Sequence, residues 1–157
     1  MGVYLNPGND KFYKAINSEI YVDKTGLIQY TNRVFNTMQQ NVCVSRPRRF
    51  GKSMTANMLA AYYSRGCQSE KLFEEFKITK DPSFRQHLNR YNVFFMNMQE
   101  FLSRSKTVEK MIFRISQLLM RDLKQEYPDI AYLMKLILRK YAGCISTYRV
   151  SICDYHR

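Results

Sequence analysis

The sequence lacks any apolar stretch of the length that a signal peptide or a membrane-spanning helix requires. It also lacks internal repeats and low-complexity linkers, and its 157 residues correspond to one domain. We therefore expect a cytoplasmic protein with no membrane partner. Met1-Gly2 does not predict myristoylation, because Asn6 stands where Ser or Thr is expected.

The sequence also lacks the residue spacing of a zinc site. Its cysteines are far apart and form no C-x-x-C pair: Cys43, Cys67, Cys144 and Cys153. The two histidines, His87 and His156, are just as widely separated, so no structural metal site is predicted. Cys43 lies inside an apolar run, where we expect it to be a small core residue and not a nucleophile.

Acidic residues are scarce. Thirteen Asp and Glu face twenty-five Lys and Arg, and the formal net charge is +12. Such a charge implies anionic partners, such as nucleotide or nucleic acid, but says nothing about the fold. Several basic residues fall along one predicted helix, and we interpret them as an ordinary solvated face in preference to a dedicated binding groove.

The most informative segment is Val42 to Ser53, in which a β-branched run meets Gly51-Lys52-Ser53 just before a helical pattern. A strand, a tight loop and a helix N-terminus together form an anion site, because backbone N–H groups and the helix dipole both face the anion. In a phosphate-binding P-loop, or Walker A motif, Lys52 would reach the β- and γ-phosphates and Ser53 would bind Mg²⁺.

The match to the motif G-x-x-x-x-G-K-[ST] is incomplete, because Arg46 holds the place of the first glycine. The loop is rich in arginine, with Arg46, Arg48 and Arg49 around Pro47, and these guanidinium groups add a strong anion field beside Lys52. The alternative is a basic surface turn with a chance Gly-Lys-Ser.

Three separated motifs resemble the bacterial and archaeal AAA-ATPase-like family: Tyr21-Val-Asp-Lys-Thr25, Arg46-Pro-Arg-Arg-Phe-Gly-Lys-Ser53 and Asn97-Met-Gln-Glu-Phe101. In that family Arg in place of the first glycine is usual. The resemblance runs from about Leu5 to Tyr141. It implies an ATP-binding domain, which in fuller members is joined to a nuclease-like domain of the PD-(D/E)XK type.

Hydrophobic periodicity gives a coarse secondary structure. Helices are predicted where apolar residues step by three and four, and extended segments where short apolar runs occur. The expected helices cover residues 11–17, a segment opening at Asp23 to Thr25, 54–66, a short helix at 72–76, one starting at 81–83, 108–127 and 129–141. The expected extended segments cover 20–22, 42–44 and 93–96. In the helix after the loop, the Met residues are expected to fill the core.

This alternation predicts an α/β fold of the P-loop NTPase kind, with three α/β/α layers around a parallel sheet and the ligand at the carboxyl ends of the strands. We expect residues 1–142 to be the N-terminal part of an AAA-ATPase-like P-loop domain. Residues 143–157 look like an aberrant tail, and a frameshift near Gly143 is our hypothesis for it.

The expected function is binding of ATP with Mg²⁺. The residues expected to bind the nucleotide are those of the loop, Arg46, Pro47, Arg48, Arg49, Phe50, Gly51, Lys52 and Ser53, with Ser53 as the Mg²⁺ ligand. The resemblance adds Asp23 and Lys24, although a plain helix cap explains Asp23 equally well. The prediction of ATP in place of GTP depends only on the family resemblance.

No hydrolysis is expected, because no apolar run after the loop ends in the carboxylate of a Walker B strand. No catalytic residue is therefore assigned. The alternative function is a basic nucleic-acid-binding module, although RNA-recognition signatures and a clear helix-turn-helix are missing. A fragment with no activity of its own is a third reading. The oligomeric state does not follow from the sequence.

Overall fold

A computed structural model describes residues 3–47, 49–128 and 152–153 of the chain. Helices predominate in these residues. The elements are α1 (Asp10–Ile16), α2 (Gly26–Val34), α3 (Lys52–Tyr63), α4 (Glu70–Phe73), the 3₁₀ helix η1 (Lys77–Lys80), α5 (Phe84–His87), β1 (Asn92–Val93), α6 (Met98–Ser103), α7 (Val108–Glu126) and β2 (Ile152–Cys153).

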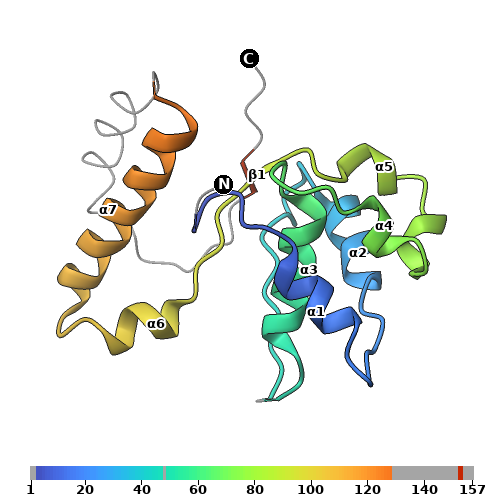
Figure 1. Ribbon diagram of the computed structural model, residues 1–157, viewed down its shortest axis with the longest axis horizontal. Coiled ribbons are helices and arrows are strands. Elements are labelled where there is room, and N and C mark those ends of the chain that lie inside the picture. The colour runs from blue at the N-terminus through green and yellow to red at the C-terminus, as the bar shows by residue number, and fades with distance from the viewer. Residues whose placement is uncertain (1–2, 48, 129–151, 154–157) are drawn as a thin grey trace.

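Figure 1 shows α1 to α5 gathered around α3 on one side of the molecule and α6 with α7 on the other. The extended chain through β1 connects the two groups. β1 pairs with β2 in an antiparallel register, with Asn92 opposite Cys153 and Val93 opposite Ile152. The described residues are thus helix-rich, and their two short strands, β1 and β2, pair antiparallel.

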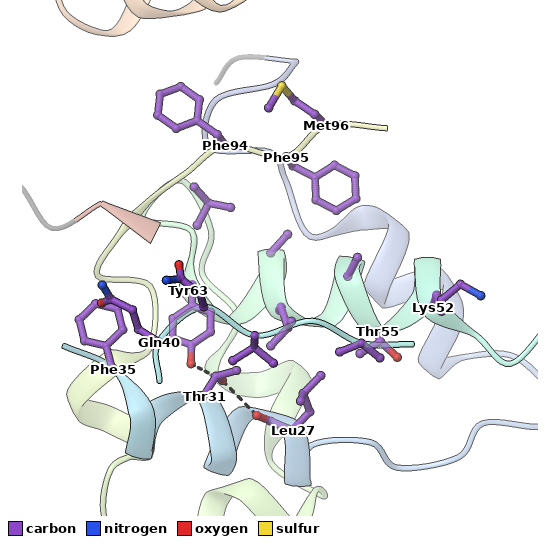
Figure 2. Close-up of a pocket in the computed structure, with 17 residues that line it drawn as sticks. Leu27, Thr31, Phe35, Gln40, Lys52, Thr55, Tyr63, Phe94, Phe95 and Met96 are labelled. Carbon is purple, nitrogen blue, oxygen red and sulfur yellow. Dashed lines mark hydrogen bonds between the residues drawn. The ribbon is translucent and has the colours of Figure 1, made fainter. Parts of the chain in front are cut away.

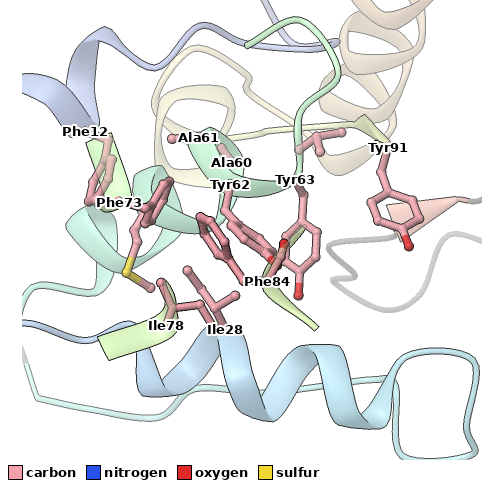
Figure 3. Packing of buried hydrophobic residues seen from close by; sticks show 12 residues of the cluster. Phe12, Ile28, Ala60, Ala61, Tyr62, Tyr63, Phe73, Ile78, Phe84 and Tyr91 are labelled. Atoms are coloured by element: carbon pink, nitrogen blue, oxygen red, sulfur yellow. The ribbon is translucent and has the colours of Figure 1, made fainter. Parts of the chain in front are cut away.

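The core is aromatic and centres on α3. Tyr62 and Tyr63 are buried at the end of α3, and Phe12 of α1 stacks on Phe73 of α4 with ring centroids 4.9 Å apart. Figure 3 shows these rings with Ile28 from α2 filling one continuous cluster. Burial of such large rings is the main source of stability for a domain of this size.

A buried polar network connects α2 to α3 inside this core. The Asn32 side-chain amide donates to the Tyr62 hydroxyl over 2.9 Å and to Ser83 Oγ over 2.9 Å. The Tyr63 hydroxyl donates to Asn32 Oδ1 over 2.6 Å. Burial raises the pKa of Tyr62 to about 12 and raises the pKa of Tyr63 further, so both hydroxyls stay protonated. The network therefore joins α2 to the end of α3 and to Ser83, directly before α5.

Asn89 ends α3. It adopts a left-handed backbone conformation with φ of +53°, and its side-chain amide donates to the carbonyls of Ala61, Tyr62 and Ser64. The last carbonyls of a helix have no partner within the helix. Asn89 therefore acts as a remote C-cap that no local sequence signal marks.

The N-terminal segment connects β1 to α7. Leu5 forms an antiparallel bridge with Phe94, and the Asn6 N–H donates to the Val93 carbonyl over 2.8 Å. Asp122 of α7 is buried, and its carboxylate accepts the Tyr4 N–H at 2.7 Å and the Leu5 N–H at 3.3 Å. This carboxylate therefore anchors the segment that pairs with residues 93–95.

Most predicted helices are confirmed. The segments predicted at 11–17, after Thr25, at 54–66 and at 108–127 correspond to α1, α2, α3 and α7. The periodic spacing is a local signal, so these helices were readable from the sequence. The helix predicted at 129–141 and the tail predicted at 143–157 lie outside the described residues, except for β2 at 152–153.

The predicted strand at 42–44 is wrong. Val42 to Val44 form neither helix nor strand, and all three residues are exposed. A strand requires a hydrogen-bonded neighbour, and no described segment pairs with residues 42–44. The expectation that Cys43 is a core residue fails for the same reason, since Cys43 is exposed. The run predicted at 93–96 is only partly a strand, at Val93.

The Met residues of α3 were predicted to fill the core. Met58 does so and is fully buried, whereas Met54 is 36% exposed. Met54 lies in the first turn of α3, next to the Gly-Lys-Ser loop, where the core does not reach. The prediction that Met58 lies in the core is therefore confirmed, and the prediction for Met54, in the first turn of the helix, is wrong.

Candidate phosphate-binding site

The loop before α3 contains two residues with left-handed backbone. Gly51 is the N-cap of α3 and is left-handed, with φ of +74°, and Arg49 is also left-handed, with φ of +69°. Alternation of left-handed and right-handed residues turns successive N–H groups toward one concave side, where an anion can bind. α3 spans twelve residues and adds the positive end of its dipole at the same place.

Lys52 folds back over this loop. Its ammonium donates to the carbonyl of Arg46 at 2.5 Å and to the carbonyl of Pro47 at 2.9 Å. The side chain therefore spans the loop from the first helical residue to its opposite end. An ammonium held in this way lies at the mouth of the loop, where it can meet an incoming anion.

The other predicted loop residues are open to solvent. The side chains of Arg46, Pro47, Arg49 and Ser53 are exposed, and Phe50 is 62% exposed. Arg48 lies outside the described residues. The cationic groups near Lys52 therefore surround the loop without being engaged in buried ion pairs, which leaves them available to an anionic ligand.

Asp23 and Lys24 come from the segment before α2. Lys24 reaches the loop, where its ammonium donates to the Phe50 carbonyl over 2.9 Å. Asp23 instead accepts the N–H of Thr25 at 2.8 Å and the N–H of Lys77 at 3.3 Å. Partial burial opposes ionisation of Asp23, but these hydrogen bonds and the Lys77 charge lower its pKa. The structure thus places Lys24 on the loop, and it places Asp23 against the backbone N–H groups of Thr25, the N-cap of α2, and Lys77 of η1.

A groove of about 510 Å³ runs along α3 from this loop. Figure 2 shows Lys52 at one end of it and Phe35 at the other, with Phe95 and Met96 on one wall and Thr31 and Tyr63 on the opposite side. Residues Val42 and Val44 line the same groove. The groove is therefore mainly apolar, with its cationic end at the loop.

Two features of the loop escaped sequence reasoning. Thr55 Oγ1 donates to the Gly51 carbonyl over 3.0 Å, which supports the first turn of α3. The spacing of four residues between Gly51 and Thr55 was a usable signal for this contact. The Lys24 contact with Phe50 joins residues 26 apart, and no local pattern predicts it.

The family model described as Predicted AAA-ATPase matches the chain over residues 8–151. The match covers most of the chain. The protein belongs to the AAA-ATPase-like family. This result confirms the resemblance drawn from the three motifs, and all three lie inside the matched range. Neither the curated proteins nor the solved structures that were searched contain a match to the chain.

Two other properties of this AAA-ATPase-like protein bear on its ligands. Among the described residues, no helix is long and apolar enough to cross a lipid bilayer. In the same part of the chain, no three His, Cys, Asp or Glu side chains gather where they could hold a metal ion by themselves.

Proposed function

We propose that this AAA-ATPase-like domain binds ATP with Mg²⁺ at the loop before α3. The observation that carries the proposal is the Lys52 ammonium spanning a loop with left-handed residues at Arg49 and Gly51, at the N-terminus of a long helix. Membership of the family supports it independently.

Each group of the loop would take one role. The N–H groups between residues 48 and 52 would cradle the phosphates, and Lys52 would exchange its carbonyl partners for β- and γ-phosphate oxygens. Ser53, exposed in the first turn of α3, would provide its hydroxyl to Mg²⁺. Arg46 and Arg49 would add positive charge at the rim.

The proposal includes the finer fold, a three-layer α/β/α P-loop domain. Segments 42–44 and 93–96 line the same groove beside α3, although they share no ladder in the described residues. In a P-loop domain the strands of a parallel sheet lie side by side against the helix that follows the loop. A groove flanked by two apolar segments is compatible with that arrangement.

The test is a competition experiment with labelled ATP. ADP should displace the label with an affinity close to that of ATP, because both carry the β-phosphate that a P-loop binds. AMP should be weaker by at least about 100-fold, since it loses two or more charge-assisted hydrogen bonds. Equal affinity for ATP, ADP and AMP would place the binding outside the loop and overturn the proposal.

The net charge of +12 favours a second candidate, binding of nucleic acid. This candidate predicts a steep loss of affinity with salt, by about 0.9 in the log–log slope for each duplex phosphate neutralised. It also predicts weaker binding when Arg46 and Arg49 are replaced by Gln. A shallow slope, or binding unaffected by the two substitutions, would exclude it.

A further inference from the structure

Lys24 makes a contact that the proposed function does not explain. Its ammonium donates a 2.9 Å hydrogen bond to the carbonyl of Phe50, directly before Gly51 in the phosphate loop. Lys52 already spans the loop from the other side through Arg46 and Pro47. The loop is therefore held by two ammonium groups at different carbonyls.

The base of the Lys24 side chain is anchored by its neighbour. Asp23 accepts the Thr25 N–H at the start of α2 and the Lys77 N–H at the start of η1. Thr25 itself is fully buried. The backbone at residues 23–25 is thus fixed to two elements, so Lys24 reaches the loop from a rigid support.

Gly51 allows the close approach. A Cβ built at this position would lie 2.4 Å from the Lys24 Nζ, a distance that real Cβ atoms do not show. The left-handed φ of +74° disfavours other residues at the same position. Gly51 therefore adopts the turn of the loop without strain and leaves room for the ammonium, which would have to shift away from a Cβ at this position.

The geometry of the peptide bond shows which side of the loop Lys24 occupies. In a trans peptide the carbonyl of Phe50 and the N–H of Gly51 point in opposite directions. The Phe50 carbonyl points at Lys24, so the Gly51 N–H points away from it. An anion held by that N–H would lie on the side of the peptide opposite to Lys24.

We propose that Lys24 is a positioning residue of the phosphate loop: its ammonium holds the Phe50–Gly51 peptide so that the Gly51 N–H faces the bound phosphate. This inference rests on the proposed function. It assigns Lys24 to the support of the loop and not to direct contact with the nucleotide, so its removal affects every ligand that uses the Gly51 N–H.

The first measurement follows the loop without nucleotide. The chain has six glycines, so selective ¹⁵N-glycine labelling gives a simple amide spectrum. The Gly51 signal is assigned as the one lost in Gly51→Ala. We expect Lys24→Met to move the Gly51 signal, Lys24→Arg to restore it, and Lys71→Met, at an exposed position on α4, to leave it in place.

The second measurement compares affinities for MgATP and MgADP in the same variants. Lys24→Met should raise both dissociation constants by about tenfold, the lower end expected for a hydrogen bond to a charged group. Lys24→Arg should recover most of this loss, because a guanidinium can also donate to the Phe50 carbonyl. The Lys71→Met control should bind as the wild type does.

The outcomes separate this inference from the proposed function. If the wild type binds nucleotide, Lys52→Ala does not, and Lys24→Met binds normally or leaves the Gly51 signal unmoved, the positioning role alone is refuted. A much larger loss for MgATP than for MgADP would also refute it, since that pattern indicates direct contact with the γ-phosphate. If the wild type binds neither nucleotide, the proposed function fails and the inference fails with it.

Discussion

Replacement of Asp122 by Asn tests how α7 is held to the rest of the molecule. The carboxylate is 1% exposed and receives the N–H groups of Tyr4 and Leu5 on Oδ2 and the Arg121 guanidinium on Oδ1. Asn has the same shape but carries one donor group, so it cannot accept on both sides. One set of these donors loses its partner.

The expected cost follows from that count. A hydrogen bond to a charged group contributes about 1.5–3 kcal/mol, so Asp122→Asn should lower the free energy of unfolding by about 2 kcal/mol at pH 7. The N-terminal segment bonded to residues 93–95 should loosen with it, since Asp122 anchors that segment.

The pH dependence has a definite sign. Burial opposes ionisation of Asp122, but the Tyr4 and Leu5 N–H groups and Arg121 outweigh it and lower the pKa of the carboxyl below 3.8. The folded protein therefore binds this proton less tightly than the unfolded chain. The stabilisation is complete above about pH 5, and it disappears as the pH falls through the folded pKa.

The assay is urea unfolding of both proteins from pH 7 down to the most acidic pH at which both still fold. The difference in the free energy of unfolding between the two proteins should be about 2 kcal/mol at pH 7, and it should become smaller in acid, where the wild-type carboxyl is protonated. Glu74→Gln, at an exposed position, is the matched control and should show no such difference. If the two proteins had the same free energy of unfolding at pH 7, or if the difference were the same at every pH, this account of Asp122 would be refuted.

Three further predictions follow from named contacts. Asn89→Ala should lower the free energy of unfolding by about 2 kcal/mol in a urea titration, because the Ala61 carbonyl loses its donor and the Ser69 N–H loses its acceptor; Asn89→Gly should behave similarly, although its left-handed backbone is then relaxed. Because burial raises the pKa of Tyr62 from 10.0 to about 12, the stabilisation from the protonated hydroxyl is complete below pH 10 and disappears as the pH rises toward 12. Alkaline unfolding followed by tyrosinate absorbance should therefore begin above pH 10. Phosphate release from MgATP should not exceed that of a Lys52→Ala blank, because no apolar run after the loop ends in a carboxylate.

Features whose physical signal lies within a few neighbouring residues could be predicted from the sequence. The helices α1, α2, α3 and α7 depend on periodicity and caps within a few residues, and they were predicted close to their bounds. The start of α3 directly after Gly51 was also readable, whereas the phosphate-binding role of Lys52 and Ser53 stays a prediction.

Contacts between distant residues could not be predicted in this way. Lys24 with Phe50, Asn89 with the end of α3 and Asp122 with Tyr4 each join segments whose spacing carries no pattern. The strand predicted at 42–44 failed for a related reason, since β-branched composition does not supply the neighbouring strand that a ladder needs. Pairing is a property of the fold and not of the segment.

The binding of MgATP to the wild type and to Lys52→Ala tests the central claim most directly. The substitution removes the ammonium that donates to the carbonyls of Arg46 and Pro47. In a calorimetric titration the wild type should bind one MgATP, and Lys52→Ala should bind at least about tenfold more weakly, because a charged hydrogen-bond donor to the phosphates is lost. Equal binding by the two proteins, with Lys71→Ala as the charge-matched control, would contradict the assignment of this loop as the nucleotide site.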